Sequence, residues 1–132
     1  MAGVNLACKP TQVVTFNMHG FNQGAAFLLE LGLSADVFFC QEHWLLTSQL
    51  YELDDMLDDL HCISVSAMDD NCRKGVLRGR PCGGLAMFIR SSMCNNMDCI
   101  VKSDRVLAVK VHNCIFYLCI FSSLSVISRI RE

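Results

Sequence analysis

The amino-acid sequence predicts an α/β protein built around a mixed β-sheet. In the first half of the chain, apolar runs of strand length alternate with helical patterns, and the second half carries strand patterns only. This order of elements is typical of an α/β layered domain. With 132 residues, 52% of them apolar, the chain is long enough for one domain with a buried core and too apolar for a disordered protein.

Two strands and two helices are predicted before residue 61. A β-branched and aromatic run over 12–17 predicts the first strand, and the apolar run 35–40 predicts the second. Between these strands, residues 24–31 predict a short helix that Gly32 ends. Leucines at helical spacing over 50–60 predict an amphipathic helix. The polar side of that helix carries four aspartates, which we expect to face solvent and not to form a metal site: Asp54, Asp55, Asp58 and Asp59.

The rest of the chain reads as strands. A polar loop rich in Gly and Arg, residues 69–83, separates the first two of them, and residues 122–132 match neither a strand nor a clear helix. The predicted strands are 61–68, 84–90, 99–102, 106–112 and 114–121.

Charge and cysteine usage narrow the class of protein. The net charge of −2 excludes a polycation that coats nucleic acid along its whole surface. No secretion signal is found, and the apolar stretch 114–127 is interrupted by serines and too short for a membrane span. Nine cysteines without a Cys-x-x-Cys pair favour buried free thiols, with zinc ligands and disulfides as alternatives. We therefore expect an intracellular protein that is not secreted and has no membrane partner.

Two polar residues follow apolar strands at the ends where ligands usually bind. Asn17 and Glu42 each close a predicted strand on its C-terminal side. A carboxylate there can hold Mg²⁺, and an asparagine beside it can contact a phosphate oxygen. The alternative is that both are ordinary polar residues at strand ends.

Four sequence blocks in order resemble a known superfamily. They are Thr-Phe-Asn-Met-His-Gly (15–20), Ala-Asp-Val-Phe-Phe-Cys-Gln-Glu-His-Trp-Leu (35–45), Gly-Arg-Pro-Cys-Gly-Gly-Leu-Ala-Met-Phe-Ile-Arg (79–90) and Asp-Arg-Val-Leu-Ala-Val-Lys-Val (104–111). Together they are similar to the N-terminal half of the endonuclease/exonuclease/phosphatase superfamily, and most similar to the endonuclease domains of non-LTR, LINE-type retrotransposon proteins. The resemblance covers residues 12–121 and leaves 122–132 as a non-matching tail.

The resemblance implies a Mg²⁺-dependent DNA endonuclease, a hydrolase of phosphodiesters. It implies that Asn17 orients the scissile phosphate and that Glu42 is the principal Mg²⁺ ligand. The strand with Gly83, Gly84 and Arg90 would shape the substrate cleft.

The basic loop would bring its arginines, Arg78 and Arg80 among them, toward DNA phosphates; a solvated loop without a ligand is the alternative. Trp44, beside Glu42, is interpreted as a packing residue, with base stacking as the alternative, and no histidine is assigned a role.

The same resemblance implies that part of the enzyme is missing. Relatives carry a Tyr-x-Pro where this chain has Phe121 and serines, and then an Asp-x-Asn and a Ser-Asp-His; the Asp-Asp-Asn at 69–71 lies in the wrong loop. We therefore expect an incomplete four-layer α/β sandwich, one mixed sheet with two helices. An uncovered apolar sheet face would then favour self-association or binding of the missing half. The expected function is a truncated, inactive endonuclease-like domain; the alternative is a non-catalytic remnant or interaction protein with weak metal or nucleic-acid binding.

Overall fold

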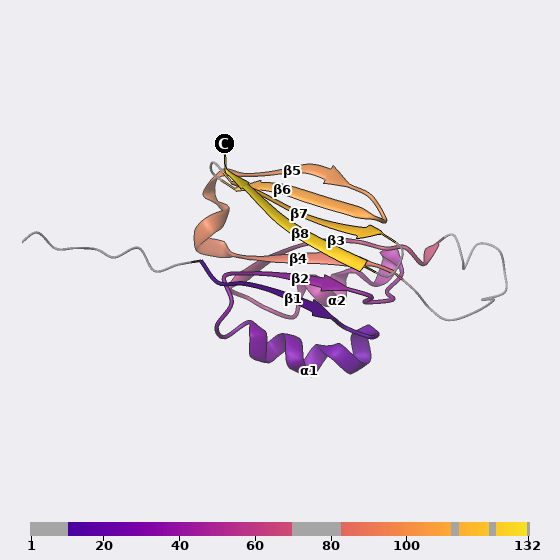
Figure 1. Ribbon diagram of the computed structural model, residues 1–132. Coiled ribbons are helices and arrows are strands. Elements are labelled where there is room, and N and C mark those ends of the chain that lie inside the picture. Colours follow the sequence, from indigo (N-terminus) through magenta and orange to yellow (C-terminus); the bar gives the residue numbers. More distant parts are fainter. Residues whose placement is uncertain (1–10, 70–82, 112–113, 122–123, 132) are drawn as a thin grey trace, which may run out of the picture.

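A computed structural model of the chain describes residues 11–69, 83–111, 114–121 and 124–131. In the last two segments it describes the backbone, and Phe116 is the one residue there whose side chain is described as well. Figure 1 shows the arrangement of these segments. The strands are β1 (Val13–Asn17), β2 (Val37–Gln41), β3 (Leu60–Val65), β4 (Leu85–Arg90), β5 (Met97–Lys102), β6 (Val106–Val111), β7 (Cys114–Phe121) and β8 (Leu124–Arg131). The helices are α1 (Phe21–Leu31), α2 (Tyr51–Asp54) and the short 3₁₀ turns η1 (Thr47–Gln49) and η2 (Ser91–Asn96).

The first sheet is mixed, as the sequence predicts. Its order is β1-β2-β4-β3; β1 runs parallel to β2, and the other neighbours are antiparallel. The parallel pair needs a crossover connection, which α1 supplies. All five residues of β2 are buried, whereas exposed and half-buried residues alternate along β1. These patterns fit a central strand and an edge strand respectively.

The remaining strands form a second sheet, so the expectation of a single sheet is wrong. Strands β5, β6, β7 and β8 follow one another in an antiparallel meander. The turn η2 separates β4 from β5 and carries the chain from the first sheet to the second. Residues 124–131, which lie in the tail that the sequence resemblance leaves unmatched, pair with β7 along its whole length. The spacing of polar residues there does not alternate strictly, which is why the sequence did not predict this strand.

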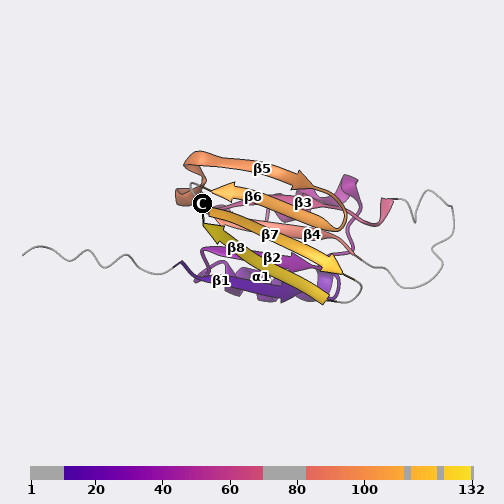
Figure 2. The same cartoon turned by 45° about the horizontal axis from the view of Figure 1, so that its top comes forward.

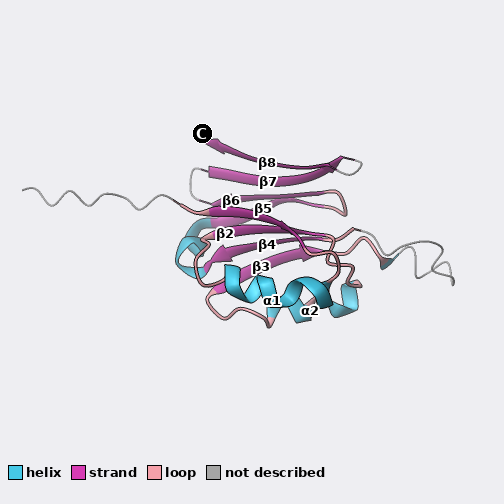
Figure 3. Ribbon diagram, turned by 60° about the horizontal axis from the view of Figure 1, so that its bottom comes forward, coloured by secondary structure: helices cyan, strands magenta, loops and turns pink. Residues whose placement is uncertain are grey.

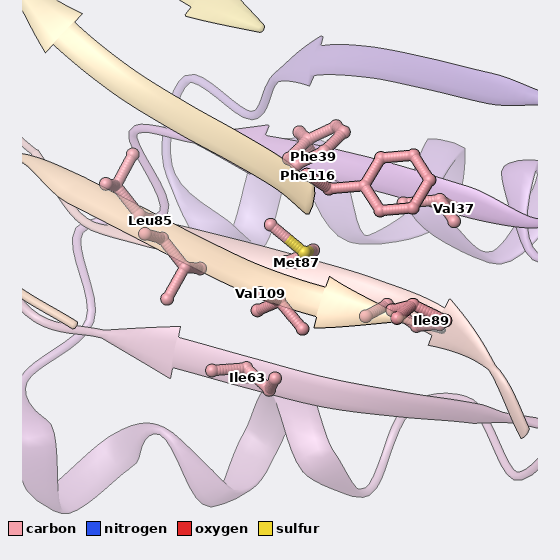
Figure 4. Close-up of a cluster of buried hydrophobic side chains, with 10 residues drawn as sticks. Val37, Phe39, Ile63, Leu85, Met87, Ile89, Val109 and Phe116 are labelled. Carbon is pink, nitrogen blue, oxygen red and sulfur yellow. The ribbon is translucent and has the colours of Figure 1, made fainter. Parts of the chain in front are cut away.

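The two sheets pack face to face and the helices cover the outer face of the first sheet (Figures 2 and 3). Between the sheets lies a buried apolar cluster that includes Val37 and Phe39 from β2 and Val109 from β6 (Figure 4). Leu107 from β6 belongs to the same cluster. A second cluster beneath the helices includes Phe38. Both faces of the first sheet are therefore covered, and the expected uncovered face does not exist on this sheet.

The described chain is nevertheless an incomplete α/β sandwich, as predicted. Helices lie against the first sheet only, so the described part of the chain has three layers: the helices, the first sheet and the second sheet (Figures 1 and 3). No described element covers the outer face of the second sheet. On β5, Ile100 and Val101 are 50% and 41% exposed.

The two helices differ from their predicted lengths in opposite directions. Helix α1 begins at Phe21, three residues before the predicted start. The helix needs glycine at position 24, because a Cβ there would lie 2.8 Å from Met18 Cβ. Without a side chain at this position, the helix can lie close to the residue that follows β1.

The predicted helix over 50–60 is one turn, α2, and ends at Asp54. Aspartates at its C-terminal end meet the negative end of the helix dipole, which disfavours further turns. Leu53 and Leu60 are still buried, and the four aspartates between residues 54 and 59 are exposed, as predicted.

The packing of the second sheet on the first can be tested with two leucines. Leu107 is fully buried between the sheets, and Leu33 is 88% exposed. We expect Leu107→Ala to lower the free energy of unfolding by about 2–5 kcal/mol, because it leaves a cavity, and Leu33→Ala to change it by less than about 0.5 kcal/mol. Urea unfolding followed by circular dichroism measures both. Equal, small effects of the two variants would mean that the sheets are not packed together.

Candidate functional site

Asn17 and Glu42 lie at one edge of the first sheet. Because β1 and β2 are parallel and in register from Val13/Val37 to Asn17/Gln41, both strands end at this edge. The Met18 N–H donates to the Gln41 carbonyl at 2.8 Å, and Glu42 is the next residue. The structure therefore brings together the two residues that the sequence analysis selected.

The Glu42 carboxylate is held in place by two donors. Its Oε2 accepts a hydrogen bond from Trp44 Nε1 at 2.8 Å and another from the Gly83 N–H at 2.9 Å. The backbone of Glu42 is bonded as well, to Gly84 on one side and Gly20 on the other. Since the Trp44 side chain and the Gly83 backbone N–H both donate to Oε2, the carboxylate has one oxygen fixed by protein and Oε1 available to a ligand.

Three residues near this carboxylate have left-handed backbone conformations. His19, Glu42 and Trp44 have φ angles of 55°, 60° and 61°. Non-glycine residues adopt positive φ angles at a cost in free energy, and they keep these angles where surrounding contacts hold the backbone in place. Here the contacts are the hydrogen bonds of the Glu42 carboxylate and backbone, so the turn geometry and the position of the carboxylate depend on each other.

His43 connects the turn to β3, an outermost strand of the sheet, at the same end where β2 finishes. Its ring is fully buried; Nδ1 accepts a hydrogen bond from the Leu45 N–H at 2.9 Å, and Nε2 lies 2.9 Å from the Val65 carbonyl. The two contacts together assign the neutral tautomer with the proton on Nε2. Gly84 is required beneath the ring, because a Cβ there would lie 2.4 Å from His43 Cε1.

The sequence did not single out His43, although its neighbours were selected. Burial lowers the pKa of His43 below its ordinary value of 6.5, while hydrogen bonds to Val65 and Leu85 and the charge of Glu42 raise it by lesser amounts. Since both ring nitrogens are engaged with backbone groups, His43 positions the turn that carries Glu42.

Trp44 packs against Gly20 at the same turn. A Cβ on Gly20 would lie 2.6 Å from Trp44 Cε3, so glycine lets the backbone lie flat on the indole ring. The His19 ring lies 6.0 Å from the Trp44 ring, centroid to centroid, at an angle of 37°. Trp44 is half-buried, so the predicted packing role accounts for part of its surface only.

The site contains two neutral polar side chains beside the carboxylate. Asn17 is exposed, and its Oδ1 accepts a hydrogen bond from the His19 N–H at 3.0 Å. This leaves the Asn17 amino group as the donor toward a ligand. Gln41 is buried next to Asn17, and its Nε2 donates to Thr15 Oγ1 at 2.8 Å.

Other predicted site residues do not join this group. Arg78 and Arg80 lie outside the described residues. Arg90 lies at the far end of β4 from Gly84, where its guanidinium donates to the carbonyls of Gly32 and Ala35. It therefore joins β4 to the segment that follows α1 and does not line the edge with Glu42.

The cysteines whose side chains the structure describes are free thiols. They are Cys40, Cys62, Cys94 and Cys99. Burial, and secondarily the neighbouring Cys62, raises the pKa of the Cys40 thiol. Because its pKa is raised, the Cys40 thiol stays protonated, and Cys40 behaves as a small apolar residue of the core.

The residues present fit a weak Mg²⁺ site with a single carboxylate ligand. In the part of the chain that the structure describes, no three or more His, Cys, Asp or Glu side chains gather around a common point. Mg²⁺ commonly keeps several waters and uses only one or two protein carboxylates, so Glu42 Oε1 can be one ligand in a largely hydrated shell.

In the same described segments, no helix is long and apolar enough to cross a membrane.

The buried His43 predicts a pH dependence of stability. Because the pKa of His43 is lower in the folded protein than its ordinary 6.5, the unfolded state binds the additional proton as pH falls through this region. We expect the free energy of unfolding to decrease between pH 7 and pH 5, and His43→Gln to flatten this decrease. Urea unfolding in EDTA at several pH values measures it. His61, which is exposed on β3, supplies the control: if His61→Gln flattens the profile equally, the assignment to His43 is wrong.

Comparisons with known proteins relate the fold, but not the sequence, to a nuclease. No protein-family model matches the chain. No curated protein matches it either. A solved structure, the AP endonuclease LMAP from Leishmania major, superimposes on 92% of this chain with a TM-score of 0.51 and 14% sequence identity.

This chain spans 40% of the length of that AP endonuclease structure. The likeness therefore concerns one part of the larger fold, and at this identity it concerns the fold alone. The chain therefore has a partial α/β fold similar to one part of that AP endonuclease structure.

Proposed function

We propose that this chain is the N-terminal part of a Mg²⁺-dependent phosphodiesterase domain of the DNA endonuclease type, derived from a LINE-type retrotransposon. One observation carries the proposal: the Glu42 carboxylate is fixed by Trp44 Nε1 and the Gly83 N–H at the sheet edge where β1 ends in Asn17. The likeness to an AP endonuclease supports a nuclease-like fold, and the four sequence blocks support the retrotransposon origin.

The two side chains have complementary roles in this proposal. Glu42 would hold the metal ion through Oε1, and Asn17 would donate its amino group to a phosphate oxygen of the substrate. The metal, when bound, supplies positive charge that stabilises the phosphate during hydrolysis. DNA phosphates would also contact the arginines of the 69–83 loop, Arg78 and Arg80, which would make binding weaker as salt increases.

These 132 residues do not supply a general base that we can assign. Ser-Asp-His is absent from the sequence, and the Asp-Asp-Asn at 69–71 lies in the basic loop. His43 is close to Glu42 in sequence, but both of its ring nitrogens are bonded to the backbone. General base catalysis contributes about 10²–10⁴-fold, and catalytic groups that act as a unit fail together when one is absent. We therefore propose that the chain alone binds without turnover.

A second candidate is a non-catalytic protein that binds a metal ion or nucleic acid weakly. It is favoured by the single fixed carboxylate, which can supply only part of an octahedral shell. We propose an intracellular location for both candidates, supported by the free thiols among the cysteines whose side chains the structure describes.

Cation binding and plasmid nicking test these proposals together. We expect weak, saturable Mg²⁺ or Mn²⁺ binding by calorimetry, lost in Glu42→Ala because the single carboxylate ligand is removed. Glu30→Ala is the matched control, since Glu30 is exposed on α1 away from the site. We expect no nicking of supercoiled plasmid above the level of Glu42→Ala.

Two outcomes would contradict the proposals. Cation binding that is equal in the wild-type chain and Glu42→Ala would remove the assigned ligand. Reproducible nicking that disappears in Glu42→Ala would show that the missing motifs are not needed for hydrolysis.

A further inference from the structure

A cavity of about 490 Å³ lies beside the turn that carries Glu42. Its walls come from the start of α1, from residues 43–45 and from η1 and α2. Cavities of about 300–1,000 Å³ are typical of small-ligand sites. The Glu42 carboxylate does not line the cavity, but it accepts a hydrogen bond from Trp44, which does. A ligand in the cavity would therefore contact the residue that holds the candidate metal ligand.

Trp44 supplies an aromatic wall with a fixed orientation. One part of the ring is covered by Gly20, and its Nε1–H edge is bonded to Glu42 at 2.8 Å. Trp44 is half-buried and lines the cavity, as does His19, whose ring lies 6.0 Å from the Trp44 ring, centroid to centroid. A ring that is held at its edge and on one side cannot turn away, which preorganises it to stack on a planar ligand.

The other walls carry amides and one carboxylate. Asn22, Gln23 and Gln49 line the cavity with Glu52. The Gln49 Oε1 accepts a hydrogen bond from the Leu46 N–H at 3.0 Å, which holds the side chain and leaves its amino group as a donor. No lysine or arginine is among the described residues that line the cavity. The charge of Glu52 and the amides favour a neutral ligand with hydrogen-bond donors over a phosphate.

We propose that this cavity is a nucleobase subsite, in which a base with an exocyclic amino group stacks on Trp44 and donates to Glu52. Carboxylates accept hydrogen bonds from such amino groups, and aromatic side chains stack on the faces of unpaired bases. The inference rests on the proposed function, because it assigns the base next to the phosphate at Glu42 a binding site of its own. It also revives base stacking, the alternative that the sequence analysis left open for Trp44.

Trp44 is the single tryptophan in the chain, so its fluorescence reports directly on the cavity. The probes are 2′-deoxycytidine, 2′-deoxyadenosine, thymidine and deoxyribose 5-phosphate, each titrated in EDTA, with a free tryptophan amide to correct for absorption. We expect saturable quenching by the two amino-bearing nucleosides, weaker quenching by thymidine and none by deoxyribose phosphate. Saturation by deoxyribose phosphate alone would mean an anion site and would overturn the proposal, as would no saturable quenching by any nucleoside.

Variants test the role of Glu52 while Trp44 stays as the reporter. We expect Glu52→Gln to weaken binding of 2′-deoxycytidine about 10-fold, the loss expected for a hydrogen bond to a charged group. Glu30→Gln makes the same chemical change on the exposed side of α1 and should have no effect. Asn22→Leu, on the first turn of α1, is a second lining variant whose weaker binding is expected if Glu52→Gln does not fold. Equal affinity in wild type and in a folded lining variant would contradict the proposal.

This experiment fails or succeeds separately from the proposed function. It uses no metal, no DNA duplex and no cleavage. Nucleosides can bind at Trp44 while Glu42→Ala leaves cation binding unchanged, which would contradict the proposed function alone. Conversely, cation binding that depends on Glu42 without saturable quenching would contradict the subsite alone.

Discussion

Burial of β2 on both of its faces is the constraint on which the rest of the structure depends. Phe38 and Phe39 are both fully buried although they point to opposite sides of the sheet. Phe38 stacks on Phe88 beneath the helices, with ring centroids 4.7 Å apart, and Phe39 packs with Phe116 of the second sheet. Burying such aromatic side chains contributes a few kcal/mol each, so the sheet is stable only with both layers in place. This central strand ends at the functional edge and delivers Glu42 there.

The turn after β2 holds the Glu42 carboxylate in a fixed position relative to this rigid sheet. Glu42 and Trp44 have left-handed backbone angles, and Gly20, Gly83 and Gly84 leave room where a Cβ would collide with the turn or its surroundings. His43 crosses over Gly84 to reach the Val65 carbonyl on β3, so the turn is tied to three strands of the sheet. Hydrogen bonds that fix a carboxylate and its neighbours before a ligand arrives reduce the free energy that binding must spend on ordering them.

The same edge would combine the two kinds of recognition that we propose. Glu42 and Asn17 offer oxygen and amide groups suited to a metal ion and a phosphate, whereas the cavity beside Trp44 offers an aromatic face, amides and Glu52. Trp44 joins the two regions, since its indole N–H group donates to Glu42 and the residue lines the cavity. Phosphodiester and base recognition would therefore be coupled through one side chain, in a fold similar to part of an AP endonuclease.

The sequence by itself determined the local elements and the strand-end residues. The periodicity of apolar residues located the strands from β1 to β7 to within a few residues, and it placed Asn17 and Glu42 at the C-terminal ends of two of them. That these two strands pair in parallel, and so end at one edge of the sheet, was decided by the tertiary structure. Only the tertiary structure decided the division into two sheets, the pairing of β8 and the shortness of α2. Each depends on contacts between distant residues, such as Leu107 packing on the first sheet, which a local pattern does not encode. The sequence did not reveal the role of His43 for the same reason. Its partner Val65 is 22 residues away, and Gly84, which makes room for its ring, directly precedes β4.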